Sequence, residues 1–227
     1  QTEIFYCLVD KGAAIETGYE NGETILHLAA KMGKPEIVRF LVEKGAAPDA
    51  ADRFGRTPLL LAVLSENFEA AKTLVALGAN ARINHENGMT LLHLGARNGD
   101  KDFAGLLLQK KVSINARDDR KRTPLNEAAF YGNLEVAAFL VEKGAKLDVG
   151  DENGWTPLHW AVYAKKDRLA LLLLENKADV NAKSSARARW EEQIYPARIT
   201  PLDIAEMNGY EETAGLLRLH GARRGKE

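Results

Sequence analysis

Three histidines stand at equivalent places in similar segments, and they are the first residues to consider for chemistry. His27, His93 and His159 each follow a threonine by three residues, in TILHLAA, TLLHLGA and TPLHWAV. Imidazole nitrogen is a common metal ligand. If the segments belong to stacked repeats, copies in neighbouring repeats are separated by roughly 10 Å, the packing distance of helices. That separation is too large for a shared ion, so the sequence predicts no metal site.

Other reactive groups do not form a recognisable catalytic set. The stretch GARRGK at 221 has the wrong spacing for a phosphate-binding loop. Cys7 has no histidine near it in the sequence, and a nucleophilic thiol needs such a base. The pairs Asp118-Asp119 and Glu191-Glu192 are interleaved with arginines, which is typical of solvated loops. We therefore expect a protein that is not an enzyme and that uses no cofactor.

Composition narrows the possible partners and the compartment. The net charge of −1 gives no general electrostatic attraction to nucleic acid or to anionic membranes. The single cysteine excludes an internal disulfide and suits a reducing compartment, so we expect a cytoplasmic protein. We also expect the protein to be monomeric. The longest apolar runs, such as LALLLL at 169, are too short to span a membrane, and no signal peptide is visible.

A repeated pattern must position all of these residues. Its first marker is a threonine-led segment, found as TILHLAA at 24, TPLLLAV at 57, TLLHLGA at 90, TPLNEAA at 123, TPLHWAV at 156 and TPLDIAE at 200. The first five copies start 33 residues apart, and the sixth is late by 11 residues. A second marker, such as LVEKGA at 41 and 140, keeps the same register from LVDKGA at 8 onward. The sequence thus predicts six repeats preceded by half of another.

One copy shows why each repeat should form two helices. Thr57 can cap a helix and Pro58 suits its first turn. An apolar face follows, then a polar break at 66–67, a second apolar helix, and Gly78 as the terminating glycine. Residues 80–88 then predict a short extended or turn segment. A single unit cannot bury its apolar faces alone, so the units must stack into a solenoid.

A 33-residue period that carries the pattern T-P-L-H-x-A resembles the ankyrin repeat over nearly the whole chain. The resemblance implies an all-α solenoid of stacked helix–turn–helix units with hairpin-like loops, and a structural, hydrogen-bonding role for the repeated histidine. We predict one domain over 1–221, with a half repeat at 1–15 whose missing first helix suggests an upstream segment. Residues 222–227 are expected to form a solvated tail. Glu206 and Arg218 replace apolar residues and predict a polar outer face on the last repeat.

The resemblance also implies that a partner binds the concave side, which is lined by loop tips and by the ends of the first helices. Aromatic residues, methionine and arginine are enriched in interface cores, and several lie at these positions by register. We therefore predict a binding stripe, while local packing of these side chains on neighbouring loops remains an alternative. The predicted residues are Arg53, Phe54, Arg56, Met89, Arg97, Arg120, Arg122, Phe130, Tyr131, Trp155 and Tyr163, together with Trp190 and Tyr195 of the insertion. Trp160 is expected to pack between helices instead.

The 11 extra residues fall in the loop before Thr200, so they form an inserted finger at about 184–197. Ser184 or Ser185 could cap a short helix that places Ala186, Trp190 and Ile194 on one stripe. The stripe could contact a partner, pack on the last repeats, or belong to a neutral insertion.

The expected function is that of a non-enzymatic scaffold that binds another protein or an extended peptide. One alternative is a regulatory or targeting arm of a larger enzyme, suggested by the uncapped amino end. Another is a nucleotide- or oligonucleotide-binding module, in which Arg97, Arg120 and Arg122 would hold phosphates. Phe130, Tyr131 and Trp155 would then stack on bases.

Overall fold

The computed structural model describes residues 19–190 and 192–225. The predicted half repeat at 1–15 and Cys7 lie outside the described residues. The chain forms two compact units, one up to Ile83 and the other from Asn84 onward, which we call unit 1 and unit 2. Each unit is described by itself below.

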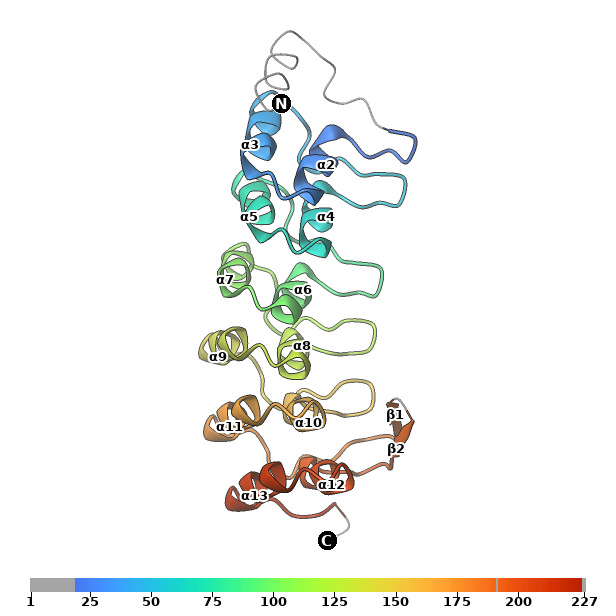
Figure 1. Ribbon diagram of the computed structural model, residues 1–227, viewed down its shortest axis with the longest axis vertical. Coiled ribbons are helices and arrows are strands. Elements are labelled where there is room, and N and C mark those ends of the chain that lie inside the picture. Colours follow the sequence, from blue (N-terminus) through green and yellow to red (C-terminus); the bar gives the residue numbers. More distant parts are fainter. Residues whose placement is uncertain (1–18, 191, 226–227) are drawn as a thin grey trace. The chain divides into compact units, whose positions relative to one another are not determined.

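The described residues of unit 1 form two helix pairs, which Figure 1 shows. The first helices of the pairs are α2 (Ile25–Lys31) and α4 (Pro58–Leu64), and the second helices are α3 (Pro35–Glu43) and α5 (Phe68–Ala76). Helix α2 packs on α4 and α3 packs on α5, so equivalent helices of neighbouring repeats are in contact.

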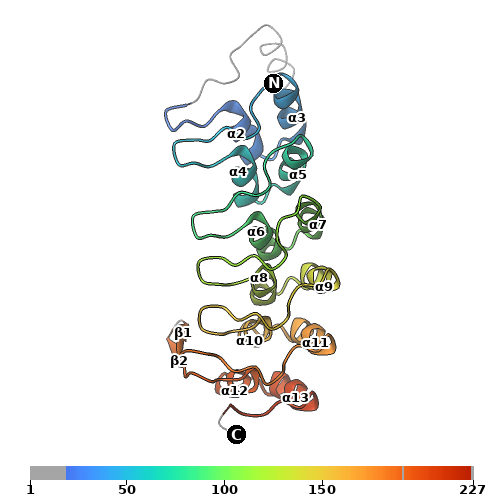
Figure 2. The same cartoon turned by 180° about the vertical axis from the view of Figure 1, so that it is seen from behind.

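Unit 2 continues the pattern with four helix pairs (Figure 1). Its first helices are α6 (Leu91–Asn98), α8 (Pro124–Tyr131), α10 (Pro157–Tyr163) and α12 (Pro201–Met207). Its second helices are α7 (Lys101–Gln109), α9 (Leu134–Glu142), α11 (Asp167–Glu175) and α13 (Glu211–Leu219). From behind, the loops of this unit extend beyond the first helices, away from the second helices (Figure 2). The prediction of an all-α repeat fold is confirmed.

The helix boundaries follow from the predicted residues. Thr57 Oγ1 accepts a hydrogen bond from the backbone N–H of Leu60, and Pro58 occupies the first turn. At the other end of the first helices, Gly99 and Gly132 adopt left-handed backbone conformations, which glycine does without steric cost. The described helices have at most nine residues, and none combines the length and apolarity needed to cross a bilayer.

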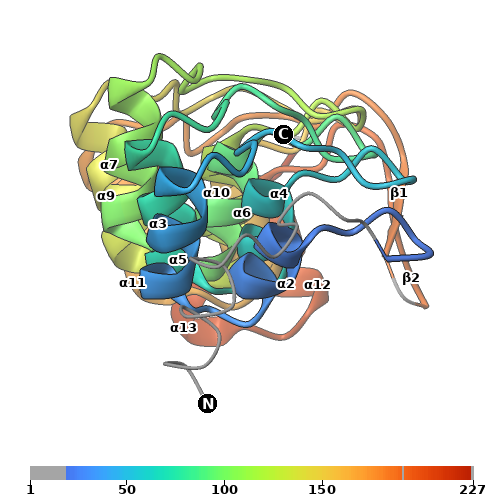
Figure 3. The same ribbon diagram turned by 90° about the horizontal axis from the view of Figure 1, so that it is seen from above.

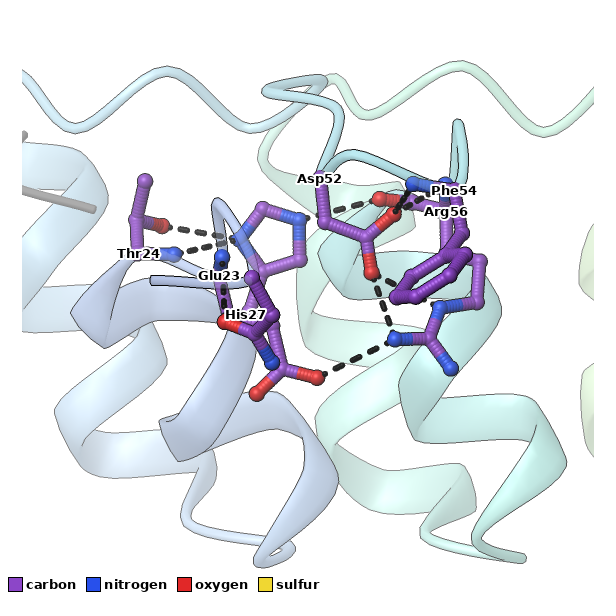
Figure 4. A network of polar contacts seen from close by, with 7 residues as sticks. Glu23, Thr24, His27, Asp52, Phe54 and Arg56 are labelled. Atoms are coloured by element: carbon purple, nitrogen blue, oxygen red, sulfur yellow. Dashed lines mark hydrogen bonds and ion pairs between the residues drawn. The ribbon is translucent and has the colours of Figure 1, made fainter. Parts of the chain in front are cut away.

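The repeated histidines connect consecutive repeats by hydrogen bonds, and Figure 4 shows the first of them. His27 Nδ1 lies 3.0 Å from the backbone nitrogen of Thr24, while its Nε2 lies 3.0 Å from the carbonyl oxygen of Arg56 in the next repeat. His93 and His159 repeat this arrangement toward the carbonyls of Arg122 and Ile199. Among the described residues, no cluster of His, Cys, Asp or Glu is arranged to hold a metal ion.

The insertion is a β-hairpin, so the prediction of a helix was wrong. Strand β1 (Ala188–Trp190) pairs antiparallel with β2 (Gln193–Tyr195). The backbone N–H of Ser184 donates to the carbonyl of Ile199 at 3.0 Å, which closes the base of the insertion. The antiparallel pairing reverses the chain and returns it to the base of the insertion. Figure 3 shows the hairpin at the outer end of its loop, far from α9 and α11.

The carboxyl-terminal residues, which were predicted to be a solvated tail, contact the last repeat, although Arg223 and Arg224 are exposed. The backbone N–H of Arg223 donates to Asn181 Oδ1, and that of Gly225 donates to Asp203 Oδ2. Arg224 forms an ion pair with Glu206, which also pairs with Arg218. Residues 222–225 therefore lie against the last repeat, over the polar positions that the sequence identified.

Candidate protein-binding surface

The structure divides the thirteen predicted site residues into three groups by exposure. The exposed ones are Arg53, Phe54, Arg97, Arg120 and Tyr131. The half-buried ones are Arg56, Arg122, Phe130, Tyr163 and Trp190. The buried ones are Met89, Trp155 and Tyr195. Met89, which is 4% exposed, and Trp155 cannot meet a partner directly, so their prediction as contact residues was wrong. Tyr195 is buried as well, but it lies in the wall of a groove described below.

Arg56 of unit 1 is engaged in an internal network rather than held out to a partner (Figure 4). Its guanidinium lies 2.7 Å from Asp52 Oδ2 and 3.3 Å from Glu23 Oε1. Burial alone would raise the pKa of the Asp52 carboxyl, but hydrogen bonds from Arg56 and from the backbone of Phe54 outweigh it and lower that pKa. Phe54 lies under the Arg56 guanidinium, 4.8 Å from ring centroid to carbon, yet remains 66% exposed.

Arg122 of unit 2 forms the same kind of internal network. Its guanidinium pairs with Asp118 at 2.8 Å and with Glu127 at 2.7 Å. Burial raises the pKa of the Glu127 carboxyl, and the charge of Arg122 only partly opposes this shift. Since Arg122 neutralises two buried carboxylates, it is not available for phosphate. The nucleotide site predicted from the arginines and aromatic residues is therefore not assembled, because Trp155 is buried as well.

Trp155 lies at the centre of an aromatic cluster in unit 2. Its ring centroid is 5.0 Å from that of Trp160, 5.2 Å from Tyr195 and 5.6 Å from Tyr163. Trp190 of the hairpin lies 4.8 Å from Trp160. The hairpin thus covers the tryptophan that would otherwise stand at an open loop tip, and Trp190 packs on the cluster. Trp160 is buried, and its ring contacts those of Trp190 in the hairpin and Phe130 in α8.

The cluster has one open side, where a groove of about 430 Å³ separates the hairpin from the ends of the first helices. The hydroxyl of Tyr195 donates to Asn208 Oδ1 at 2.9 Å, which orients the amide of Asn208. The rings of Phe130 and Tyr163 are nearly parallel, with centroids 6.2 Å apart. The groove is lined by Phe130, Tyr163, Ala164, Lys166, Trp190, Gln193, Tyr195, Asn208 and Tyr210.

Sequence reasoning missed the polar part of this lining. Lys166 and Tyr210 follow the first helices, at equivalent positions of consecutive repeats, and Gln193 lies on the hairpin. Only the register of the last repeats, with the insertion counted out, could have indicated that Lys166 and Tyr210 flank the same groove. The side chain of the insertion predicted to share a stripe with Trp190, Ile194, points away from the cluster and is 41% exposed.

The exposed residues of the predicted stripe lie outside the groove lining, and one pair of them, Arg97 and Tyr131, adjoins the groove. The guanidinium of Arg97 lies 4.9 Å from the centroid of the Tyr131 ring, and Tyr131 contacts Phe130 edge to face at 5.0 Å. Arg97 and Tyr131 therefore extend the aromatic surface of unit 2. Arg53 and Phe54 lie on a loop tip of unit 1, and Arg120 on a loop tip of unit 2.

A larger depression of about 960 Å³ lies at the end of unit 2, beside residues 224–225. Most of its charged groups are already engaged. Arg224 pairs with Glu206, Lys183 Nζ donates to the carbonyl of Gly225, and Asp203 accepts the backbone N–H of that glycine. The aromatic groove is smaller, but five of its lining residues are aromatic, and aromatic side chains are enriched in interface cores.

A family model described as ankyrin repeats in three copies matches the chain over residues 1–87, 45–118 and 92–184. The matches end at Ser184, where the hairpin insertion begins. No curated protein matches the chain.

Proposed function

Because this chain belongs to the ankyrin-repeat family, whose repeats generally serve as protein–protein interaction modules, we propose that it is a non-enzymatic scaffold that binds an extended segment of a partner protein. The binding site is the aromatic groove of unit 2, between Phe130, Tyr163 and Trp190. Arg97 and Tyr131 form its continuation along the surface that the resemblance identifies as concave. A cytoplasmic and monomeric protein remains a prediction from the sequence.

The observation that carries this proposal is the open side of the aromatic cluster. Half-buried rings of Phe130, Tyr163 and Trp190 combine large contact area with few rotatable bonds, which is the property of residues that dominate binding energies. Each ring packs against others of the cluster, with centroid distances between 4.8 and 6.5 Å. Such a surface is preformed, so a partner loses little binding free energy to ordering it.

The groove suits an extended segment rather than a small molecule. Its polar groups include the amides of Asn208 and Gln193 and the ammonium of Lys166, beside the hydroxyls of the lining tyrosines. Amides of this kind can satisfy the backbone of a peptide. The proposal holds equally if the chain is the binding arm of a larger enzyme, because the surface itself needs no catalytic group.

The test begins with selection from a phage-displayed library of random peptides, about a dozen residues long, on the immobilised chain. The selected peptides are synthesised and their Kd is measured by fluorescence anisotropy. Ala164→Trp places a bulky neutral side chain in the groove, since Ala164 lines it. Ser65→Trp is the matched control, because Ser65 ends α4 of unit 1 as Ala164 ends α10.

We expect Ala164→Trp to weaken binding by about tenfold or more, which corresponds to about 1.4 kcal/mol, and Ser65→Trp to leave it unchanged. Circular dichroism verifies that both variants retain their helices. Equal affinity for the wild type and Ala164→Trp, or a selection that enriches no peptide over a blank surface, would show that the groove is not the binding site.

A further inference from the structure

We infer that the groove selects segments in which an acidic residue stands next to a large apolar or aromatic side chain. This inference rests on the proposed function and names the chemistry of the partner. It is carried by the juxtaposition of an ammonium group with an aromatic surface in unit 2.

The described residues that line the groove carry positive charge and no negative charge. Lys166 contributes an ammonium group, and no described residue of the lining carries a carboxylate. Lys165 lies next to it, with Nζ 5.4 Å from the centroid of the Tyr210 ring. Arg97 adds a third positive charge over Tyr131. An incoming carboxylate is therefore attracted, and an incoming lysine or arginine is repelled.

The aliphatic part of the Lys166 side chain, its stem, packs against the backbone of the preceding repeat. The stem crosses Gly132, where an added Cβ atom would come within 2.7 Å of Lys166 Cδ. Gly132 is left-handed at φ 80° and leaves the space that the lysine stem occupies. Within the described ranges, Lys166 forms no ion pair with a carboxylate of the chain. Lys166 lines both the groove and a neighbouring depression that also contains Gly132 and Asp167. Its charge therefore lies at the edge of the groove and forms no ion pair there with a described carboxylate.

The amide of Asn208 explains why the acidic residue should lie on an extended backbone. The Tyr195 hydroxyl occupies Asn208 Oδ1, so the carboxamide NH₂ of Asn208 is the part left to donate to a peptide carbonyl. The apolar side chain of the segment would contact Phe130, Tyr163 and Trp190. Successive side chains of an extended segment point to opposite sides of its backbone. The apolar side chain can therefore contact the rings while the acidic side chain next to it reaches the ammonium group.

The experiment uses the synthetic peptides from the selection described above. For each peptide, a second version carries Asn or Gln in place of Asp or Glu, and a third carries Lys. Binding is measured to the wild type, to Lys166→Glu and to Lys34→Glu. Lys34 is the matched control, because it precedes α3 of unit 1 as Lys166 precedes α11 and is exposed.

We expect the selected peptides to pair acidic with apolar residues and to lose about tenfold in affinity for Lys166→Glu, but not for Lys34→Glu. Neutralising the acidic residue should weaken binding to the wild type and make it insensitive to Lys166→Glu. The version that carries Lys should bind Lys166→Glu more tightly than the wild type.

The outcomes separate this inference from the proposed function. Peptides that are sensitive to Ala164→Trp but carry no acidic residue, or that ignore Lys166→Glu, overturn the charge preference and leave the groove as the binding site. Peptides that ignore Ala164→Trp overturn both. A preference for basic peptides that depends on Glu192 of the hairpin turn also overturns the inference.

Discussion

Trp155 and Arg122 occupy the same position in consecutive repeats, and the backbone N–H of each donates to a carboxylate four residues earlier. The distances are 2.9 Å from Trp155 to Asp151 and 2.7 Å from Arg122 to Asp118. The side chains then differ completely. Arg122 turns its guanidinium to the carboxylate, whereas Trp155 places its indole among other rings. One backbone turn therefore supports an ion-pair network in one repeat and an aromatic cluster in the next.

The first prediction concerns the centre of the aromatic cluster. Trp155 is fully buried, and its indole N–H has no hydrogen-bond partner among the described residues. We expect Trp155→Ala to lower the free energy of unfolding by about 3–5 kcal/mol because it leaves a cavity. Trp155→Phe should cost much less, since it keeps a ring and removes no hydrogen bond. Urea denaturation measures both, and Phe54→Ala, at a 66% exposed residue, should be nearly neutral.

A second prediction concerns the Arg122 network. Arg122→Met would leave the buried carboxylates of Asp118 and Glu127 without their cation, so we expect a loss of about 3 kcal/mol in unfolding free energy. The double variant Arg122→Met with Glu127→Leu should recover most of this loss. It reproduces the Met89 and Leu94 pair of the preceding repeat.

The chain itself shows that the remaining carboxylate can do without a cation. Asp151 has a tryptophan where Asp118 has Arg122, and it still accepts backbone hydrogen bonds. A double variant that is less stable than Arg122→Met alone would contradict this prediction. It would show that the cost of Arg122→Met does not come from leaving the Glu127 carboxylate without its cation. Thermal denaturation of the wild type and of both variants at one pH decides the question.

A third prediction is a pH dependence due to His159. Burial lowers the pKa of His159 from 6.5 to about 4. The unfolded chain therefore takes up a proton at this histidine before the folded chain does. The contribution of His159 to the free energy of unfolding has its full value above pH 6.5. It decreases by roughly 3 kcal/mol in total as the pH falls toward about 4.

His159→Asn should remove this loss while keeping the fold. Asn126 occupies the equivalent position one repeat earlier, where its Oδ1 accepts from Thr123 and its Nδ2 donates to the carbonyl of Trp155. The measurement is the unfolding free energy of wild type and variant over this pH range. Burial raises the pKa values of Glu127 and Asp151, which acts in the opposite direction, but these contributions cancel in the difference. Parallel curves would contradict the prediction.

A fourth prediction tests the core of the repeats. Leu140 lies on the inner face of α9 and is fully buried. Leu140→Ala should lower the free energy of unfolding by about 2–5 kcal/mol. Leu219→Ala is the control, because Leu219 is 85% exposed. Guanidinium denaturation should show a large shift of the midpoint for the first variant and none for the second.

Local signals in the sequence were sufficient to predict the helices and the register of the repeats. The threonine cap and the proline that follows it predicted where first helices begin, and the 33-residue register placed His27, His93 and His159 in equivalent bonds. These features depend on neighbours within one or two repeats. The same pattern appears in each copy, so the register could be established without coordinates.

The exposure of individual site residues could not be predicted in the same way. Trp155 and Arg122 have the same register, and their environments depend on what lies beyond the loop tip. For Trp155 this is the hairpin, whose strand period places Trp190 and Tyr195 inward. A helical period, which the same residues also allowed, would have placed Ile194 beside Trp190. The insertion forms a hairpin whose base is closed by a backbone hydrogen bond, and the composition of the insertion does not reveal this closure.

The loop tips of unit 2 are joined by backbone hydrogen bonds, from Asp119 to Asn87, from Glu152 to Arg120 and from both Ser185 and Ala186 to Asn153. The bond of Ser185 and the closure between Ser184 and Ile199 come before the hairpin strands begin. The extra residues are thus appended outside the framework that holds the repeats in line. Exchanging the insertion at this junction would leave these hydrogen bonds in place but uncover Trp155, so a replacement would have to supply side chains that cover this tryptophan as Trp190 and Tyr195 do.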